Sequence, residues 1–186
     1  MEPIWIILGI VAVLIIVIII IYNRLVALRQ TTHQAWSDIE VQLKQRQDLV
    51  PQLVNTVKGY AAHERETFEE VISARSAAVN ASSVEAQAQA EGMLGQALGK
   101  LFALAEAYPD LKANTNFLQL QDQLSDIENK IAASRRFYNN AVQEYNTATE
   151  QFPAVLIAGP FNFERRDFFE APEGREMLQT PVEVTF

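Results

Sequence analysis

The sequence of 186 residues contains no cysteine, which excludes disulfide bonds, thiolate metal ligands and cysteine nucleophiles. Basic residues are also scarce, since 15 Lys and Arg stand against 23 Asp and Glu for a formal net charge of -8. They occur singly or in pairs, so no basic stripe is available to replace the counterions of phosphate groups. We therefore expect no nucleic acid among its partners.

Charge is absent altogether from one long segment. Residues 4–22 read IWIILGIVAVLIIVIIIIY and include fifteen Ile, Val and Leu. A helix of this length measures about 28 Å, close to the roughly 30 Å hydrocarbon core of a bilayer. The aliphatic side chains favour insertion by about 5 to 9 kcal/mol in total. We therefore predict an N-terminal membrane anchor in residues 1–22, with the lipid bilayer as partner.

A cleaved signal peptide is the alternative interpretation, but the apolar region is too long, Glu2 stands where a basic start is usual, and no A-x-A site follows. Arg24 and Arg29 follow the segment closely, whereas Glu2 is the only charged side chain before it. The positive-inside rule then places the C-terminal domain in the cytoplasm. The opposite topology, with an exported C-terminal domain, is the alternative.

Beyond residue 22, apolar residues recur at steps of three and four along two long stretches, from Leu25 to Tyr60 with one stutter and from Phe117 to Ala148 without interruption. The first has inward positions at Leu25, Leu28, Thr32, Ala35, Ile39, Leu43, Arg46, Val50, Leu53, Val57 and Tyr60. The second has Phe117, Leu120, Leu124, Ile127, Ile131, Ser134, Tyr138, Ala141, Tyr145 and Ala148. These coiled-coil-like seams predict two helices of similar length at 23–58 and 115–150, about 54 Å each, packed as antiparallel neighbours.

Neither Gly nor Pro separates Tyr22 from Leu25, so the membrane helix is expected to run straight into the first seam, with a kink at Pro51. Residues 63–80 either extend this helix or form a second one. Ser82 and Glu85 predict a capping box for a following helix that ends before Pro109. That helix contains Gly92, Gly95 and Gly99, and we expect it to form a tightly packed or intersubunit surface.

The last part of the chain, residues 153–186, loses the helical period and holds four of the seven prolines and five of the ten phenylalanines. The expected fold is therefore all-α, with an elongated antiparallel helical bundle at 23–152 and an irregular Phe-rich tail packed on it. Within the tail, FNFERRDFFEA places Arg165 and Arg166 among aromatic residues. We interpret it as a strap held on the bundle, and a membrane-surface or partner-docking motif is the alternative.

Motifs for catalysis or metal binding are incomplete. His63-Glu64 begins an HExxH pattern, but Thr67 stands where the second His must be. Neither histidine follows a Glu at the three-residue spacing of bundle di-iron sites. The acidic run from Glu64 to Glu70 reads as a solvated helix face, and GQALGK at 95–100 is too short for a phosphate-binding loop. We predict no catalytic, cofactor-binding or metal-binding residue, and no enzyme.

Arg46 falls on the first seam, where a charge without a partner is costly. Glu128 or Asp126 on the later helix can supply one. A structural ion pair is the preferred interpretation, with an active site as the alternative.

Three long blocks carry a resemblance to a known family. They are YNRLVALRQ from Tyr22, AWSDIEVQLKQRQDLVPQLVNTVKGYAAHE from Ala35, and YPDLKANTNFLQLQDQLSDIENKIAASRRFYNNAVQEYNTATEQFP from Tyr108. They resemble the LemA family of bacterial membrane proteins. The resemblance implies a single-pass protein of the inner (plasma) membrane, with the amino terminus outside and a helical bundle in the cytoplasm. It supplies no catalytic residues. Exported relatives carry a lipoprotein cysteine before the Tyr-Asn pair, which this chain lacks.

The resemblance also suggests a role, since some family members are similar to magnetosome-membrane proteins and some are encoded near membrane metalloproteases. Our first hypothesis is a non-enzymatic, membrane-anchored scaffold that forms homo-oligomers and organises or shapes the bacterial membrane. The alternative is an adaptor for a membrane metalloprotease or an envelope-stress or signalling partner. The long seams and the small-residue helix favour the first.

Overall fold

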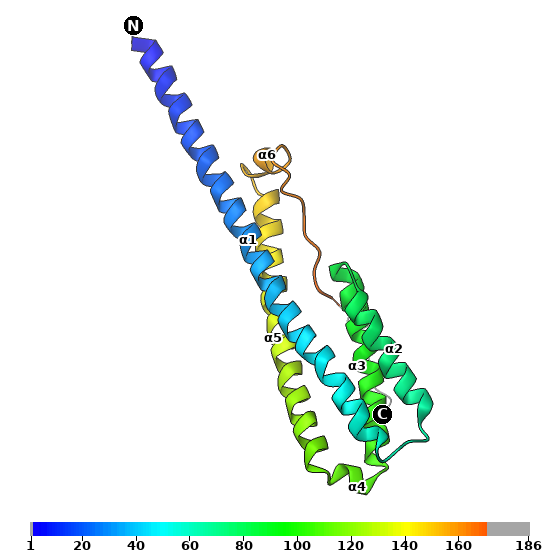
Figure 1. The fold of residues 1–186 in the computed structure, drawn as a ribbon. Coiled ribbons are helices and arrows are strands. Elements are labelled where there is room, and N and C mark those ends of the chain that lie inside the picture. The colour runs from blue at the N-terminus through cyan, green and yellow to red at the C-terminus, as the bar shows by residue number, and fades with distance from the viewer. Residues whose placement is uncertain (1, 171–186) are drawn as a thin grey trace, which may run out of the picture. The chain divides into compact units, whose positions relative to one another are not determined.

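The computed structural model describes residues 2–170 and is built from helices, with no strand in that range (Figure 1). The helices are α1 Glu2–Lys58, α2 Arg65–Asn80, α3 Val84–Glu106, α4 Pro109–Lys112, α5 Thr115–Glu150 and α6 Val155–Ala158. The predicted all-α fold is confirmed. Residues 171–186, the end of the predicted tail, lie outside the described residues.

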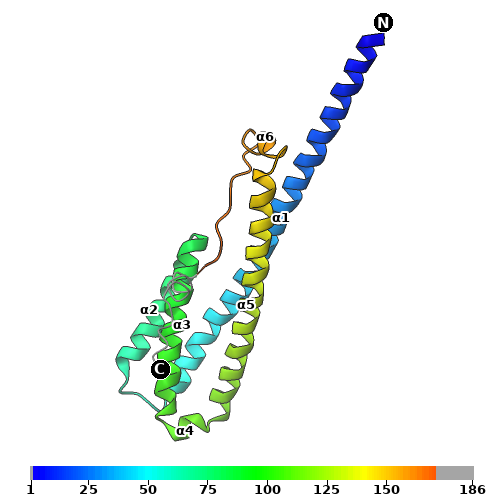
Figure 2. The same cartoon turned by 180° about the vertical axis from the view of Figure 1, so that it is seen from behind.

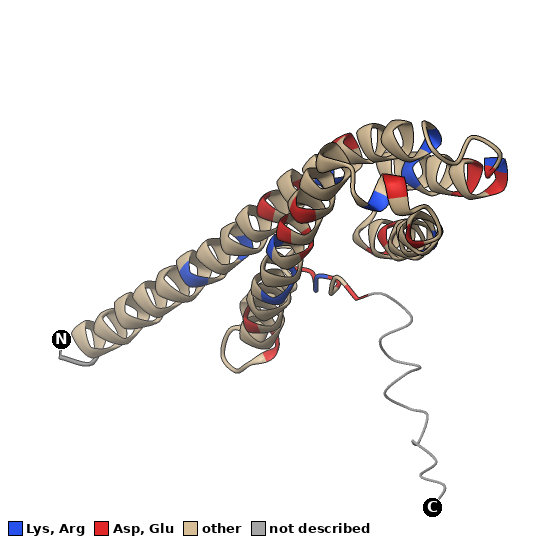
Figure 3. Cartoon of the chain, turned by 90° about the horizontal axis from the view of Figure 1, so that it is seen from below, with Lys and Arg blue, Asp and Glu red and all other residues tan. Residues whose placement is uncertain are grey.

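Helix α1 joins the apolar segment to the first seam without a break, as expected, and Pro51 lies inside it. It is the one described helix that is long and apolar enough to cross a membrane. The side chains of residues 4–20 are all exposed, and Figure 3 shows no charged residue along this part of α1. An apolar surface with no protein to cover it is what a lipid-facing helix requires.

Burial follows both predicted seams. Nine of the eleven positions from Leu25 to Tyr60 are buried, Leu28 is half-buried, and Tyr60 is exposed because α1 ends at Lys58. In α5, nine of the ten positions are buried and Ser134 is half-buried. The three-four spacing keeps these side chains on one face of each helix, which is why they form the core.

The described residues divide into two compact units. Residues up to Ser37 form the first unit with Arg136–Asp167, and Asp38–Arg135 form the second with the residues from Phe168. Each unit thus contains part of α1 and part of α5, running in opposite directions (Figures 1 and 2). The units are described separately below.

In the second unit, α2 and α3 lie side by side as a hairpin (Figure 2). Helix α2 is separate from α1, which answers the question that the sequence left open. The chain turns at Gly59, where the amides of Tyr60 and Ala61 both donate to the Val57 carbonyl oxygen at 3.0 Å. The short helix α4 then connects α3 to α5.

The predicted capping box was wrong by one residue. The N-cap of α3 is Ser83, with extended backbone angles, and its hydroxyl accepts from the Ala86 amide at 3.2 Å. The third helical position, where a capping box needs Glu or Gln, is therefore Ala86. Asn114, which the sequence reading missed, caps α5 by accepting from the amides of Asn116 and Phe117.

In the first unit, the chain after α5 folds back onto α1. Its core consists of Leu25, Tyr145, Ala148, Ala158 and Phe163. Asn162 has a φ of 56°, a left-handed conformation that asparagine tolerates better than most residues. This residue turns the chain after α6 so that Phe163 enters the core.

Candidate functional site

A buried ion pair lies at the centre of the second unit. Arg46 of α1 and Glu91 of α3 are 5% and 6% exposed, with Arg46 Nη1 3.0 Å from Glu91 Oε2. Arg46 Nε lies 2.8 Å from Glu128 Oε1 of α5. Of the two predicted partners, Glu128 is the one used, whereas Asp126 pairs with Lys130 at 2.6 Å. One guanidinium therefore links three helices.

Glu91, which the sequence reading missed, is fully engaged. Its Oε1 accepts from Gln47 Nε2 at 2.7 Å and from Gln87 Nε2 at 2.9 Å. Gln87 in turn donates to the Ala78 carbonyl oxygen at 3.1 Å, which ties α3 to the end of α2. A buried carboxylate whose two oxygens both accept hydrogen bonds in this way stabilises one packing arrangement.

Gly95 makes room for the guanidinium. A Cβ at this position would lie 3.3 Å from Arg46 Nη2, closer than most real contacts. Gly92 and Gly99 have no such neighbour, because a Cβ on either would meet nothing within 4 Å. The tight packing predicted for the glycine-rich helix is therefore observed at one of the three glycines.

The cluster is unevenly solvated. Glu91 and Arg46 are buried, but the Glu128 side chain is 43% exposed. Burial raises the pKa of the Glu128 carboxyl above its ordinary value, the Arg46 guanidinium opposes this, and the negative Glu91 adds to it. Although Arg46 Nε is within ion-pair distance of Glu128, its N–H does not point at the carboxylate and makes no hydrogen bond.

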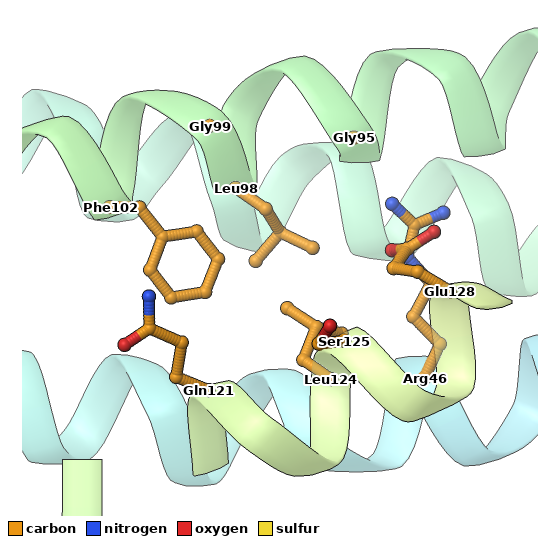
Figure 4. Close-up of a pocket in the computed structure, with 9 residues that line it drawn as sticks. All are labelled: Arg46, Gly95, Leu98, Gly99, Phe102, Gln121, Leu124, Ser125 and Glu128. Carbon is orange, nitrogen blue, oxygen red and sulfur yellow. The ribbon is translucent and has the colours of Figure 1, made fainter. Parts of the chain in front are cut away.

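An open groove of about 440 Å³ lies beside this ion pair, between α3 and α5 (Figure 4). Its lining residues are Arg46, Gly95, Leu98, Gly99, Phe102, Gln121, Leu124, Ser125 and Glu128. Ser125 is the sole hydroxyl in that lining, and no histidine accompanies it to act as a base. The groove is suited to apolar side chains, with one charged end.

The remaining sequence motifs do not assemble a site. Within residues 2–170, no group of three or more His, Asp or Glu is placed to hold a metal ion. Glu70 of the acidic run pairs with Lys100 at 2.5 Å on the surface. Residues 95–100 lie inside α3, where backbone amides are used by the helix and cannot cradle a phosphate.

In the first unit, residues 161–167 lie along α1 and α5 as a strap. The Tyr22 ring meets the rings of Phe161 and Phe163 edge-on, at centroid distances of 5.2 and 5.6 Å. The Arg29 guanidinium lies 4.8 Å from the centre of the Phe163 ring, within the range of a cation–π contact. Aromatic contacts therefore hold the strap against the end of the apolar segment.

Hydrogen bonds hold the rest of the strap. Asn146 of α5 pairs with both backbone groups of Arg166, donating to its carbonyl and accepting from its amide, each at 2.9 Å. Tyr138 donates to the Asp167 carbonyl at 2.9 Å. Arg166 Nη2 also lies 2.7 Å from His33 Nε2, and partial burial, followed by Arg166 and Arg29, lowers the pKa of His33.

The chain is similar to several characterised sequences. The model of the LemA family matches residues 35–186. Magnetosome protein MamQ 2 of Paramagnetospirillum magneticum is 28% identical over 187 residues, which cover 86% of this chain and 69% of the relative. Magnetosome protein MamQ of Magnetospirillum gryphiswaldense is 27% identical with the same coverage. Protein LemA of Metamycoplasma hominis is 29% identical over 156 residues, covering 81% of this chain and 69% of the relative.

The family match includes most of α1 beyond the apolar segment, all of α2 to α6, and the strap. It thus spans the buried cluster around Arg46 and the helices that carry it. Together with the apolar segment of α1, the match shows that this chain is a membrane-associated member of the LemA family.

Proposed function

We propose that this protein is a non-enzymatic, membrane-anchored scaffold that self-associates through its helical bundle and organises or shapes the bacterial membrane. The observation that carries the proposal is the continuity of α1. One helix contains both the apolar segment and Arg46, whose ion pairs join it to α3 and α5. The apolar segment and Arg46 are therefore joined by a helix and not by a loop.

Exposed apolar side chains on α2 support the proposed self-association. Ile72 and Val79 are both exposed and are seven residues apart, so they lie on the same face of the helix. Apolar side chains at this spacing are the kind that pair two helices from separate chains. The names of the magnetosome protein relatives support a role of such an assembly at a membrane.

For orientation, we propose a single-pass protein of the inner membrane with the amino terminus outside and the bundle in the cytoplasm. Arg24 and Arg29 follow the apolar segment, and the positive-inside rule places that side in the cytoplasm. Fluorescent and alkaline phosphatase reporters fused after Phe186 distinguish the two sides. Phosphatase activity with no fluorescence would contradict this topology.

Self-association is tested by the mass of the full-length protein in lipid nanodiscs or mild detergent, measured by light scattering. We expect a homo-oligomer, and we expect Ile72→Asp with Val79→Asp to lower the mass while the circular dichroism spectrum keeps its helical signal. Ser73→Asp adds charge to the same helix away from the Ile72 face and should leave the mass unchanged. A monomer at every protein concentration would contradict the proposal.

The groove beside Arg46 favours a second function, an adaptor that binds a partner such as a membrane metalloprotease. Gly99→Leu tests it, since a Cβ at Gly99 would meet no atom within 4 Å and the position lines the groove. Gly92→Leu is the matched control, because a Cβ there also meets no atom within 4 Å but the position lies outside the groove lining. Crosslinking between this protein and the protease is measured in cells. Its loss in the Gly99→Leu variant but not in the Gly92→Leu variant supports the adaptor, and equal crosslinking in the two variants contradicts it.

A further inference from the structure

The segment that contains α6 is unusually apolar for a surface. Residues 151–163 read QFPAVLIAGPFNF and contain no charged side chain. Four large apolar side chains in this segment are exposed. They are Phe152 at 80%, Leu156 at 66%, Phe161 at 53% and Val155 at 46%. Four exposed large apolar side chains within one short segment indicate a candidate interaction site.

The fold places this segment beside the end of the membrane helix. The Phe161 ring contacts the Tyr22 ring, and Ile21 and Tyr22 pack against the core that includes Ala158. Tyr22 is the last residue of the uncharged segment 4–22. When that segment spans the bilayer, Tyr22 lies at the boundary between acyl chains and headgroups, and Phe161 is held at the same depth.

The segment also carries few groups that oppose contact with lipid. Charged residues flank it on both sides, with Glu150 before it and Glu164 to Asp167 after it. Glu150 and Arg165 form an ion pair with each other at 2.8 Å, whereas Glu164 is exposed. Its backbone amides are largely engaged, since those of residues 155–158 donate to carbonyls of residues 151–154 and that of Phe163 donates to Ala158. Satisfied backbone groups and an uncharged surface lower the cost of entering the membrane interface.

We propose that residues 151–161 form a second membrane contact, in which Phe152, Val155, Leu156 and Phe161 enter the headgroup and acyl boundary of the bilayer that α1 spans. The inference requires α1 to be inserted but does not depend on self-association. Its occupant is the lipid surface, because Tyr22 fixes the depth of the patch. Two contacts with one bilayer would restrain the tilt and rotation of α1, which a single helix leaves free.

The absence of native cysteine permits a direct test in the full-length protein. Leu156→Cys, Met93→Cys and Val13→Cys are each labelled with an environment-sensitive fluorophore and reconstituted into phosphatidylcholine vesicles. Met93 is the matched control, an exposed apolar residue on α3 that lies outside the proposed self-association surface. Quenching is measured with lipids spin-labelled near the headgroup end of the acyl chain and with aqueous iodide.

We expect lipid quenching at Leu156→Cys to exceed that at Met93→Cys by about two-fold or more, with the opposite order for iodide. Val13→Cys reports the insertion of α1 itself. Strong quenching by the spin-labelled lipids at Val13 with none at Leu156 overturns this inference but leaves the membrane insertion of α1 intact. No lipid quenching at either position overturns the insertion of α1 as well as this inference. If the Leu156 probe becomes accessible to iodide when the protein is diluted into excess lipid, a second copy of the chain covers the patch, and the inference is wrong.

Discussion

The Arg46 guanidinium and the Glu91 carboxylate meet at 3.0 Å inside the bundle, and each side chain is only 6% exposed. The two residues are 45 positions apart in the sequence and on different helices. Each charge depends on the other because neither has water to replace the lost partner. The pair therefore determines how α3 packs against α1, and its removal is the first test of the bundle.

Glu91→Gln should destabilise the protein by about 3 to 5 kcal/mol, the usual cost of breaking a buried ion pair by removing one partner. The substitution keeps the side-chain volume but leaves Arg46 with Glu128 alone. The carbonyl oxygen of the new glutamine can still accept from Gln47 and Gln87, but its NH2 group then faces the Arg46 guanidinium, which is also a donor. The free energy of unfolding is measured by urea titration in detergent, followed by circular dichroism.

The control is Glu70→Gln, which breaks the solvent-exposed pair between Glu70 and Lys100. Exposed pairs contribute about 0 to 1 kcal/mol, so this variant should unfold close to the native protein. Equal losses in the two variants would show that burial of the Arg46 pair has no special role.

The pH dependence of the unfolding free energy tests whether burial raises the pKa of Glu128. Its pKa in the folded protein is raised above the ordinary value of 4.5, chiefly by burial. The folded state then binds a proton more tightly than the unfolded state, so the free energy of unfolding falls as pH rises through the interval above 4.5. Because the side chain is 43% exposed, the fall should be small.

The measurement is the difference in unfolding free energy between the native protein and Glu128→Gln, taken across acidic to neutral pH. The variant cannot titrate at this position, so the difference should decrease as pH rises. If the ion pair with Arg46 outweighed burial, the difference would increase instead, and this account of Glu128 would be incorrect.

Asn146→Ala should release the strap. The amide of Asn146 makes both hydrogen bonds to the Arg166 backbone, so its loss leaves these part-buried groups without their partner at a cost of about 1 kcal/mol. We expect faster trypsin cleavage after Arg165 and Arg166, detected by mass spectrometry. The control variant Asn140→Ala, at an exposed position of the same helix, should be cleaved by trypsin at the native rate. Unchanged cleavage with Asn146→Ala would argue against this role.

Ser83→Ala should cost about 1 kcal/mol, because the Ala86 amide loses the side-chain acceptor that caps α3. The neighbouring Ser82→Ala serves as its control and should have little effect. Thermal unfolding followed by circular dichroism distinguishes the two. A larger loss with Ser82→Ala would restore the capping box that the sequence suggested.

The long helices were predictable because their signals are local. The bounds of α5, Thr115–Glu150, agree with the predicted stretch, since an uninterrupted seam of threes and fours leaves one face to bury. The start of α3 was harder, because Ser82 and Ser83 can both cap a helix and side-chain type alone does not choose between them. The start of α3 at Val84 is set by the extended backbone of Ser83, the residue before it.

The candidate site was predicted in part. A charge on the seam at Arg46 signalled that a buried partner was required, and Glu128 was named as one of two. Glu91 carried no such signal, because it lies in an alanine-rich helix whose rotation about its own axis determines which side chain faces Arg46. That rotation depends on packing against other helices, which no local pattern encodes.

The sequence by itself determined that residues 4–22 form an apolar segment suited to a bilayer, and that two periodic stretches pack as helices. Both follow from the kinds of side chain and their spacing within single stretches of the sequence. Only the tertiary structure decided that Glu91 completes the Arg46 cluster and that residues 161–167 return to Tyr22. These contacts join residues far apart in the sequence, and their geometry is set by how helices pack and where the chain turns.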